Sequence, residues 1–442
     1  MAEFNAPANE AEFDKNFAQL KPHMTKTQAY LESSRCLFCY DAPCIKACPT
    51  AIDIPLFIRQ IHSGNVNGAA KTIYESNYLG NTCGKVCPTE VLCEGACVFV
   101  EANEKPLEIG RLQTYATQQV LANDKDLFTL PETGKNKVAI IGAGPAGLAC
   151  ACELRLHGVA VDIYEAKTKA SGLISHGVAP YKIQNEEAWG ETDYLERKFG
   201  FRIFYGHPVT EVTQTKYLED NYDAVFIGTG LGKTSQMGIP GEHLQNVFGA
   251  VELIEKLRDQ KNKLHFPGNV IVLGGGNTAM DAASEAARMG AKEVTLVYRR
   301  SKNEMGAYEF EYDLAKSVGV KAIFNAAPVE ILGDEKAKGI KFIRTKEVQG
   351  KVEPIAGTEF VLDCDWVVKA TGQEKHRNLF SLIQGLHTDA AGKLLVDAAS
   401  YRCMATKYFA GGDAVSGGQE VVNAAAEGKQ AAFGILTFLN KE

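Results

Sequence analysis

Residues 137–165 read KVAIIGAGPAGLACACELRLHGVAVDIYE. An apolar run, VAII, leads directly into Gly142, Gly144 and Gly147, and a second apolar run, VDIYE, closes the stretch. This order is typical of a strand, a tight glycine turn, a helix and a second parallel strand, within about 30 residues. The stretch therefore predicts a βαβ unit, and with it a parallel sheet covered by helices.

The three glycines of this stretch have separate tasks. The first allows a tight turn, the second lets the backbone approach a pyrophosphate, and the third lets helix and strand pack closely. Phosphates would then lie at the helix N-terminus, and a carboxylate at the end of the second strand could accept hydrogen bonds from ribose hydroxyls. A glycine turn that binds no nucleotide is the alternative. The residues expected to bind a dinucleotide are Gly142, Gly144, Pro145, Ala146, Gly147 and Glu165.

Residues 269–300, NVIVLGGGNTAMDAASEAARMGAKEVTLVYRR, repeat the pattern with a different ending. The second strand here ends in two arginines instead of an acid. One guanidinium group can donate two hydrogen bonds to the oxygens of a phosphate. This ending therefore suits the 2′-phosphate of NADPH and favours NADPH over NADH. A solvated strand end, or an ion pair with Glu304, is the alternative. The residues expected to bind the nicotinamide nucleotide are Gly274, Gly276, Asn277, Thr278, Ala279, Arg299 and Arg300.

A third segment, YFAGGDAVSGGQEVVNAAAEGKQAAFGI at residues 408–435, places Asp413 after a short apolar run and two glycines. In flavoproteins with two dinucleotide domains, such a segment closes the FAD site. The FAD domain would then be interrupted by the nicotinamide domain, with AVFIGTG (224–230) and VVKATG (367–372) at the crossings. The further residues expected to bind cofactor are Gly172, Leu173, Lys182, Thr371, Gly372, Gly412 and Asp413.

Eight of the twelve cysteines lie in two blocks between Cys36 and Cys97. The first block reads C-x2-C-x4-C-x3-C-P, and the second reads C-x3-C-P-x4-C-x3-C. Such density indicates disulfides or metal ligation. The N-terminal MAEFNAPANEAEFDKNF lacks an export signal, which disfavours disulfides and leads us to expect a cytoplasmic protein. The first block follows the bacterial ferredoxin pattern, whose fourth cysteine ligates a second cluster, and two structural zinc sites are the alternative.

Length and composition fit a globular protein of several domains. The chain has 442 residues, 45% of them apolar and 23% charged, with a net charge of −7. It has no apolar run long enough to cross a bilayer and no large basic cluster, so we expect neither a membrane nor a nucleic acid as a partner. The predicted fold class is α/β, with two Rossmann-like domains after a helical one. The expected domains are a helical iron–sulfur domain at 1–134, an FAD-binding domain at 135–245 and 373–442, and an NAD(P)H-binding domain at 246–372.

Four segments together resemble a known family: CLFCYDAPCIKACPTAIDIPLFIRQI (36–61), GAAKTIYESNYLGNTCGKVCPTEVLCEGAC (68–97), PLEIGRLQ (106–113) and YFAGGD (408–413). They are similar to the N-terminal half of dihydropyrimidine dehydrogenase and to its stand-alone bacterial electron-input subunit. The glutamate synthase small subunit shares the architecture but typically has a shorter second cysteine block. The spacing of the second block therefore favours the pyrimidine branch.

This resemblance implies two [4Fe-4S] clusters with an unusual ligand set. Spacing alone would make Cys83 the eighth ligand and Gln113 an ordinary helix residue, whereas the family pattern leaves Cys83 out. The first cluster would be held by Cys36, Cys39, Cys44 and Cys97. The second cluster would be held by Cys48, Cys87, Cys93 and Gln113.

The resemblance also implies an activity. NADPH or NADH would reduce FAD, and the clusters would pass single electrons onward. The family's large enzyme continues into an FMN barrel with the pyrimidine site, which is not found up to Glu442. We therefore expect an FMN-containing, PreA-like partner subunit that reduces uracil or thymine at the 5,6 bond, in a hetero-oligomer. The alternatives are a glutamate synthase small subunit, a ferredoxin:NADP oxidoreductase, and a redox sensor that binds nucleotide without turnover.

One position departs from the family pattern. The family usually has Gly-Gly-Leu after the acid-ended strand, whereas this chain reads Ser171-Gly172-Leu173. A serine has less backbone freedom than glycine at such a turn. No catalytic triad or carboxylate pair is evident in the sequence, so no acid–base residue is expected to carry the reaction.

Overall fold

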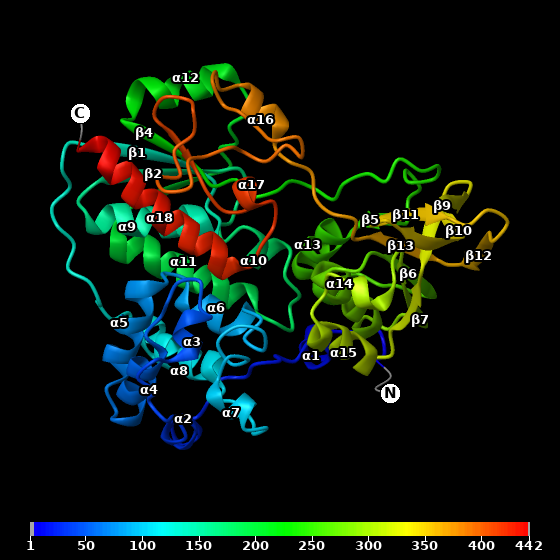
Figure 1. Ribbon diagram of the computed structural model, residues 1–442, viewed down its shortest axis with the longest axis horizontal. Coiled ribbons are helices and arrows are strands. Elements are labelled where there is room, and N and C mark those ends of the chain that lie inside the picture. Colours follow the sequence, from blue (N-terminus) through cyan, green and yellow to red (C-terminus); the bar gives the residue numbers. More distant parts are fainter. Residues whose placement is uncertain (1–3, 441–442) are drawn as a thin grey trace. The chain divides into compact units, whose positions relative to one another are not determined.

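A computed structural model describes residues 4–440, which form two compact units (Figure 1). We call them the main unit and the inserted unit. The main unit comprises Leu20–Ser175, Lys182–Leu231 and the described residues from Lys375 to Asn440. The inserted unit comprises the described residues up to Gln19, His176–Tyr181 and Gly232–Glu374. The residues before Leu20, which the domain scheme above places with the cysteine blocks, thus group with the inserted unit.

A five-stranded parallel sheet in the order β14-β4-β1-β2-β3 forms the centre of the main unit. One face packs against α12 and α16 and the other against α9 and α18, while α11 packs on the far side of α9, as Figure 1 shows. The strands are β1 (Lys137–Ile141), β2 (Ala160–Glu165), β3 (Arg202–Tyr205), β4 (Ala224–Ile227) and β14 (Tyr408–Ala410). The helices are α9 (Pro145–Leu156), α10 (Leu173–His176), α11 (Asn185–Phe199), α12 (Val212–Asn221), α16 (Arg377–Ser381), α17 (Asp413–Ser416) and α18 (Val421–Leu439).

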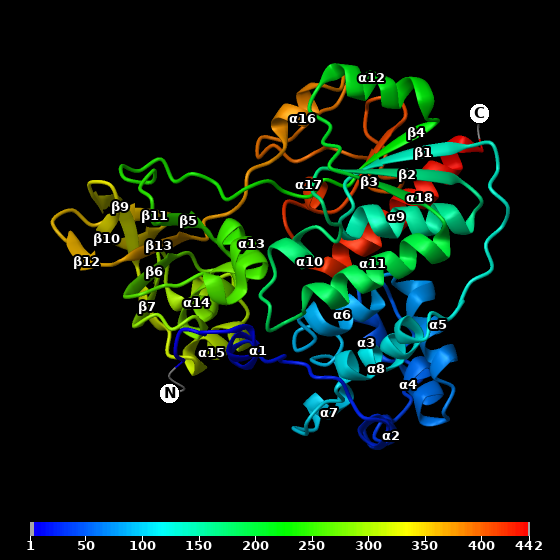
Figure 2. The ribbon, with the colours of Figure 1, turned by 180° about the vertical axis from the view of Figure 1, so that it is seen from behind.

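The C-terminal helix α18 packs along α9, the helix that follows the first strand of this sheet (Figure 2). The two helices are so close that a Cβ on Gly428 would stand 2.0 Å from the backbone oxygen of Ala146. Only glycine permits this approach. The return of α18 and β14 to β1 and β4 gives the main unit the interrupted sequence that the C-terminal segment predicts.

The cysteine-rich part of the main unit is helical. Its helices α6 and α8 approach each other closely at Gly84 and Gly110. A Cβ on Gly84 would stand only 2.8 Å from Gly110 O, so the crossing needs a glycine there. Glu191 of α11 accepts hydrogen bonds from the N–H groups of Asn81 and Thr82 and so joins the sheet region to the start of α6. The helices are α2 (Lys26–Ser34), α3 (Pro43–Lys46), α4 (Ile54–His62), α5 (Val66–Ser76), α6 (Gly80–Val86), α7 (Val98–Glu101) and α8 (Ile109–Ala122).

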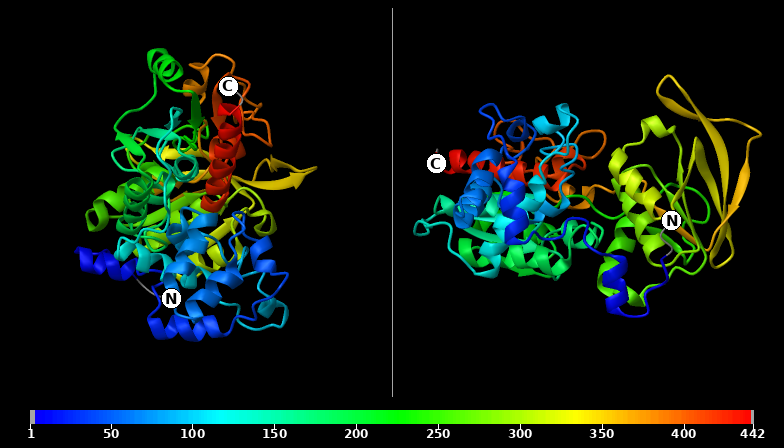
Figure 3. Two further views of the ribbon diagram at one scale, coloured as in Figure 1. Left: turned by 90° about the vertical axis from the view of Figure 1, so that its left-hand side faces the viewer. Right: turned by 90° about the horizontal axis from the view of Figure 1, so that it is seen from below.

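The inserted unit holds a second parallel sheet, in the order β5-β13-β6-β7-β8, and an antiparallel sheet of four strands. Figure 3 shows the long strands of the antiparallel sheet side by side. The strands of the two sheets are β5 (Val247–Gly249), β6 (Asn269–Leu273), β7 (Glu293–Tyr298), β8 (Lys321–Phe324), β9 (Ala326–Gly333), β10 (Ala337–Val348), β11 (Lys351–Pro354), β12 (Phe360–Asp363) and β13 (Trp366–Lys369). The helices of the inserted unit are α1 (Glu10–Asn16), α13 (Ala250–Gln260), η1 (Lys261–Lys263), α14 (Asn277–Arg288), η2 (Lys302–Glu304) and α15 (Glu309–Ser317).

Helix α1 belongs to the core of this unit. Phe13 and Phe17 are buried and stack on each other at 4.4 Å, and Phe17 stacks on Tyr181 at 6.4 Å. The predicted α/β class with two Rossmann-like sheets is confirmed. None of the helices between residues 4 and 440 is long and apolar enough to cross a membrane.

Candidate cofactor sites

The turn after β1 leaves space at one of its three glycines. A Cβ on Gly142 would stand 2.6 Å from Gly228 O, and one on Gly147 would stand 2.0 Å from Gly142 O, so both positions need glycine. At Gly144 the nearest such atoms are 3.9 Å away, which leaves room for a phosphate against the backbone. Because α9 begins at Pro145, the free N–H groups of its first turn lie at this point. The turn fits a pyrophosphate.

Glu165 fastens this turn to the end of β2. It is 8% exposed, and its two carboxylate oxygens accept the N–H groups of Ala143 and Lys167, each at 2.8 Å. Ala143 lies between the first two glycines of the turn. Since each carboxylate oxygen can accept more than one hydrogen bond, the group also retains capacity for a ribose hydroxyl pair.

Ser171 takes the conformation of a glycine. Its φ is 77°, a left-handed value that costs an L residue about 1–2 kcal/mol. Its N–H donates to Ala143 O at 2.9 Å, and its buried hydroxyl lies 2.7 Å from the hydroxyl of Thr192 on α11. The family's glycine turn is therefore retained despite the serine. The neighbouring predicted residues are half-buried in the main unit: Gly172, Leu173 and Lys182.

The turn before α17 lies beside the start of α9. A Cβ on Gly412 would stand 3.0 Å from the Cβ of Ala146, and the Gly412 N–H donates to Glu427 of α18 at 2.7 Å. Burial raises the pKa of Asp413, while the N–H of Gln419 opposes this shift. The predicted closing segment is thus placed next to the first glycine turn.

The turn after β6 repeats the design in the inserted unit. Gly274 has a φ of 151°, and a Cβ there would stand 2.5 Å from a backbone oxygen. A Cβ on Gly276 would have no heavy atom of another segment within 4 Å, so the backbone is open there. Asn277 begins α14 and accepts a backbone N–H at 3.0 Å. Thr278 is half-buried and Ala279 is buried against the sheet.

Arg299 and Arg300 directly follow β7, as expected. Arg299 is exposed, whereas Nε of Arg300 is buried and has no hydrogen-bond partner in the described part of the chain. The carboxylate of Glu304 accepts the N–H and hydroxyl of Ser301 at 3.1 and 2.7 Å. Arg300 therefore has an unused donor at the strand end where a ribose is expected, which fits a 2′-phosphate.

The two chain crossings run next to each other at the edge of the inserted unit. The Gly232 N–H donates to Glu374 O at 2.8 Å, and the Ser235 N–H donates to Gly372 O at 2.9 Å. The hydroxyl of Thr371 donates to Ser235 O at 3.3 Å. The predicted residues Thr371 and Gly372 thus lie in the paired crossing segments.

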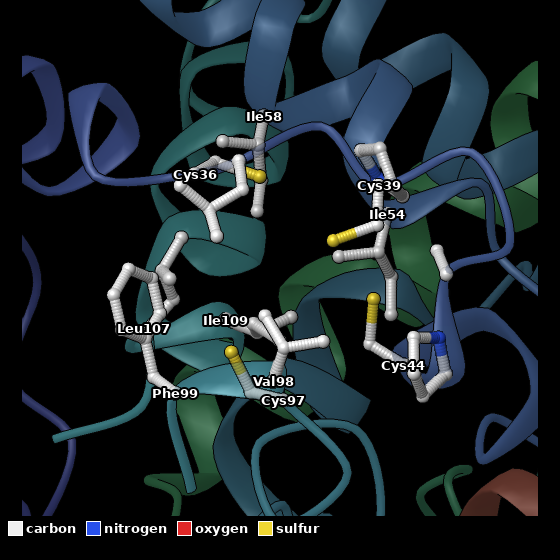
Figure 4. Close-up of a pocket in the computed structure, with 14 residues that line it drawn as sticks. Cys36, Cys39, Cys44, Ile54, Ile58, Cys97, Val98, Phe99, Leu107 and Ile109 are labelled. Carbon is white, nitrogen blue, oxygen red and sulfur yellow. The ribbon is translucent and has the colours of Figure 1, made fainter. Parts of the chain in front are cut away.

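Four cysteines line one pocket of the helical region, and we call them the first cysteine group: Cys36, Cys39, Cys44 and Cys97. Figure 4 shows their sulfur atoms around the same cavity, among apolar side chains such as Ile54 and Leu107. Burial raises the pKa of Cys44 to about 12, and the nearby thiols of Cys36 and Cys97 add to the shift. These are the four residues that the family resemblance assigns to one cluster.

A second cysteine group contains Cys48, Cys87 and Cys93. Burial raises the pKa of Cys93, and the charges of Glu94, Cys87 and Cys48 raise it further. Lys21 opposes this shift.

Both candidates for the eighth ligand lie on the crossing helices α6 and α8. Gln113 is 6% exposed, and its Nε2 donates to Gly80 O at 2.6 Å, which leaves Oε1 for an iron. Cys83 is buried one turn before Cys87, and a hydrogen bond between the two thiols raises the pKa of Cys87. The choice of Gln113 over Cys83 stays a prediction.

The chemistry of these groups suits clusters. All twelve cysteines are free thiols, and no three His, Cys, Asp or Glu side chains between residues 4 and 440 converge on a point for a single ion. A [4Fe-4S] cluster makes a different demand, because each thiolate binds a separate iron and the sulfurs stand around a cavity. The first cysteine group has this arrangement.

Comparison with protein families agrees with these sites. Residues 13–125 match a family described as dihydropyrimidine dehydrogenase domain II, 4Fe-4S cluster, and residues 136–428 match the pyridine nucleotide-disulphide oxidoreductases. The chain belongs to the pyridine nucleotide-disulphide oxidoreductase family. This oxidoreductase uses FAD, NAD(P)H and [4Fe-4S] clusters, as the motifs predict.

Curated relatives of the oxidoreductase include three from Escherichia coli K12. It is 35% identical to the putative oxidoreductase AegA over 93% of this chain and 66% of AegA. It is 32% identical to the glutamate synthase [NADPH] small chain, covering 96% of this chain and 94% of that one. It is also 32% identical to the NAD-dependent dihydropyrimidine dehydrogenase subunit PreT, covering 95% and 97%.

Solved structures share the fold of the two dinucleotide domains. Mycobacterium tuberculosis FprA in complex with NADPH has a TM-score of 0.59 and 20% identity, over 69% of this chain and 85% of that one. The thioredoxin reductase of T. acidophilum has a TM-score of 0.54 and 20% identity, over 69% and 100%. At this identity the likeness shows the fold alone.

Sequence reasoning missed two charged residues that contact the cysteine-rich helical region. Lys21 lies in the irregular segment before α2 and contacts the second cysteine group, and no motif surrounds it. Glu191 is fully buried in α11, where a helical pattern with several acidic residues reads as a solvated face. Neither residue has a signal in its local sequence, because each is defined by contacts with segments far along the chain.

Proposed function

We propose that this oxidoreductase is the electron-input subunit of a dihydropyrimidine dehydrogenase. It takes electrons from NAD(P)H and delivers them to an FMN-containing partner subunit that reduces uracil or thymine. The observation that carries the proposal is the second cysteine block with Gln113, buried on α8 with its amide nitrogen engaged and its oxygen left for an iron. This combination resembles the pyrimidine branch of the family.

The residues of the chain suit such a relay. FAD held at the turn after β1 would supply the exchange between a two-electron hydride donor and the one-electron iron–sulfur clusters. The turns at Gly144 and Gly276 leave backbone open to the two dinucleotides. Arg300 offers a donor for a nucleotide phosphate, and the first cysteine group holds a cluster site within an apolar pocket.

The surface beside the first cysteine group suits a protein partner. Leu37 is 64% exposed, and Tyr40 is fully exposed, directly beside Cys36 and Cys39. Exposed apolar side chains that lie together commonly mark a protein interface. A partner that contacts this surface would approach the pocket that the cysteines line.

The second candidate is the small subunit of a glutamate synthase. The relative of that name is as similar in sequence as PreT, and its name specifies NADPH, whereas PreT is named as NAD-dependent. The unpaired Nε of Arg300 favours NADPH. The expected preference for NADPH therefore favours the glutamate synthase function, whereas Gln113 and the second cysteine block favour the dihydropyrimidine dehydrogenase function.

Reconstitution with each type of partner separates the two functions. The oxidoreductase is mixed anaerobically with a PreA-like FMN subunit or with a glutamate synthase large subunit. We expect uracil-dependent oxidation of NAD(P)H with the first and no oxidation dependent on glutamine and 2-oxoglutarate with the second. The opposite pattern would overturn the proposal. Leu37→Asp should slow oxidation with the partner by about tenfold, because it puts a charge into the contact, while reduction of the flavin by NAD(P)H stays unchanged.

A further inference from the structure

A lysine from outside both cysteine blocks reaches the second cysteine group. Nζ of Lys21 donates to the backbone oxygen of Cys87 at 3.0 Å and to the hydroxyl of Thr89 at 2.8 Å. Lys21 is half-buried. Its ammonium group is therefore held at a fixed point on the loop that follows α6, next to Cys87, an expected ligand of one cluster.

A carboxylate lies in the same segment, because Glu94 directly follows Cys93 in the sequence. Glu94 is itself fixed, because its Oε1 accepts the N–H of Gly110 at 2.9 Å. The segment that carries Cys87 and Cys93 thus has a fixed carboxylate on it and a fixed ammonium group bonded to it.

The first cysteine group has a different cation. Arg59 is exposed, and its guanidinium group stacks at 4.7 Å on the ring of Phe38, which lies between Cys36 and Cys39 in the sequence. Water screens an exposed charge far more than a half-buried one. The two groups therefore differ in how strongly a fixed positive charge acts on them.

We propose that Lys21 is a positioning residue that raises the reduction potential of the cluster held by the second cysteine group. One-electron reduction adds a negative charge to the cluster, and a nearby fixed cation stabilises the reduced form more than the oxidised form. The electron comes from the flavin, which NAD(P)H reduces. The proposal rests on the cluster ligands assigned above and does not depend on which partner or substrate receives the electrons.

Redox titration monitored by electron paramagnetic resonance tests this role in the whole holoenzyme. We expect Lys21→Met to move the midpoint of one cluster to lower potential and to leave the other unchanged. Lys21→Arg should keep both midpoints near the wild-type values. Gln113→Ala identifies the signal of the second cluster, and that is the signal we expect to move.

Two further variants separate charge from packing. Lys21→Gln keeps a polar side chain but is neutral, so it should shift the same midpoint even if Lys21→Met loses iron. Lys26→Met removes an exposed lysine at the start of α2 and should shift neither midpoint. Unchanged midpoints in Lys21→Gln with full iron content, or an equal shift in Lys26→Met, would overturn the proposal. Absence of a second cluster signal in the wild type would contradict both this role and the ligand assignment, whereas failure with uracil would affect only the proposed partner.

Discussion

The two dinucleotide turns share one backbone design but end in opposite charges. In the main unit, Glu165 already accepts two backbone N–H groups and holds the turn closed. In the inserted unit, Arg300 keeps a buried Nε without a partner among the described residues. The comparison shows that one strand-end residue is engaged by the fold while the other keeps a free donor, and we propose that both bind their dinucleotides. Changes in the first turn should therefore cost stability, and changes in the second should cost specificity.

The largest effect is expected at Gly147. In Gly147→Ala the new Cβ would stand 2.0 Å from Gly142 O, so strand β1 and helix α9 must separate. We expect a loss of about 3 kcal/mol in the free energy of unfolding, as for an overpacked core, together with loss of FAD. Urea unfolding and the FAD content per chain after gel filtration measure the two effects.

The open glycine of the other turn, Gly276, which corresponds to Gly144 of the first turn, supplies the control. Gly276 has no heavy atom within 4 Å of an added Cβ. Gly276→Ala should therefore keep its FAD and lose less than about 1 kcal/mol of stability, while binding NADPH more weakly because the methyl group occupies the phosphate space. Full FAD content in Gly147→Ala would contradict the close packing on which the comparison rests.

An intermediate effect is expected at Arg300. Hydrogen bonds to charged groups contribute about 1.5–3 kcal/mol, so Arg300→Ala should lower kcat/KM for NADPH by roughly 10- to 100-fold. The value for NADH should stay nearly unchanged, because NADH has no 2′-phosphate. Lys321→Ala removes an exposed cation from the same unit and should change neither value. Equal losses with both nucleotides would mean that Arg300 does not read the 2′-phosphate.

The sequence was sufficient where the signal is local. The glycine spacing and the short apolar runs on either side of each helix predict both βαβ units, because each strand, turn and helix is specified within about 30 residues. The place of α1 was not predictable in this way. Its phenylalanines, Phe13 and Phe17, show that one helix face is buried, but the partner Tyr181 lies far along the chain. Lys21 could not be predicted for the same reason, since its contact with Cys87 depends on how a loop folds back.

The smallest effect is expected at Ser171. This residue supports the first dinucleotide turn through the hydrogen bond from its N–H to Ala143 O. Its φ of 77° favours glycine by about 1 kcal/mol over alanine, whereas its hydroxyl beside Thr192 contributes about 1 kcal/mol. Ser171→Gly exchanges one contribution for the other and should be nearly neutral in urea unfolding. Ser171→Ala keeps the backbone strain and loses the hydroxyl, so it should lose about 1 kcal/mol. Equal stability of the two variants would mean that the left-handed conformation carries no strain, and the turn would then tolerate serine for its hydrogen bond alone.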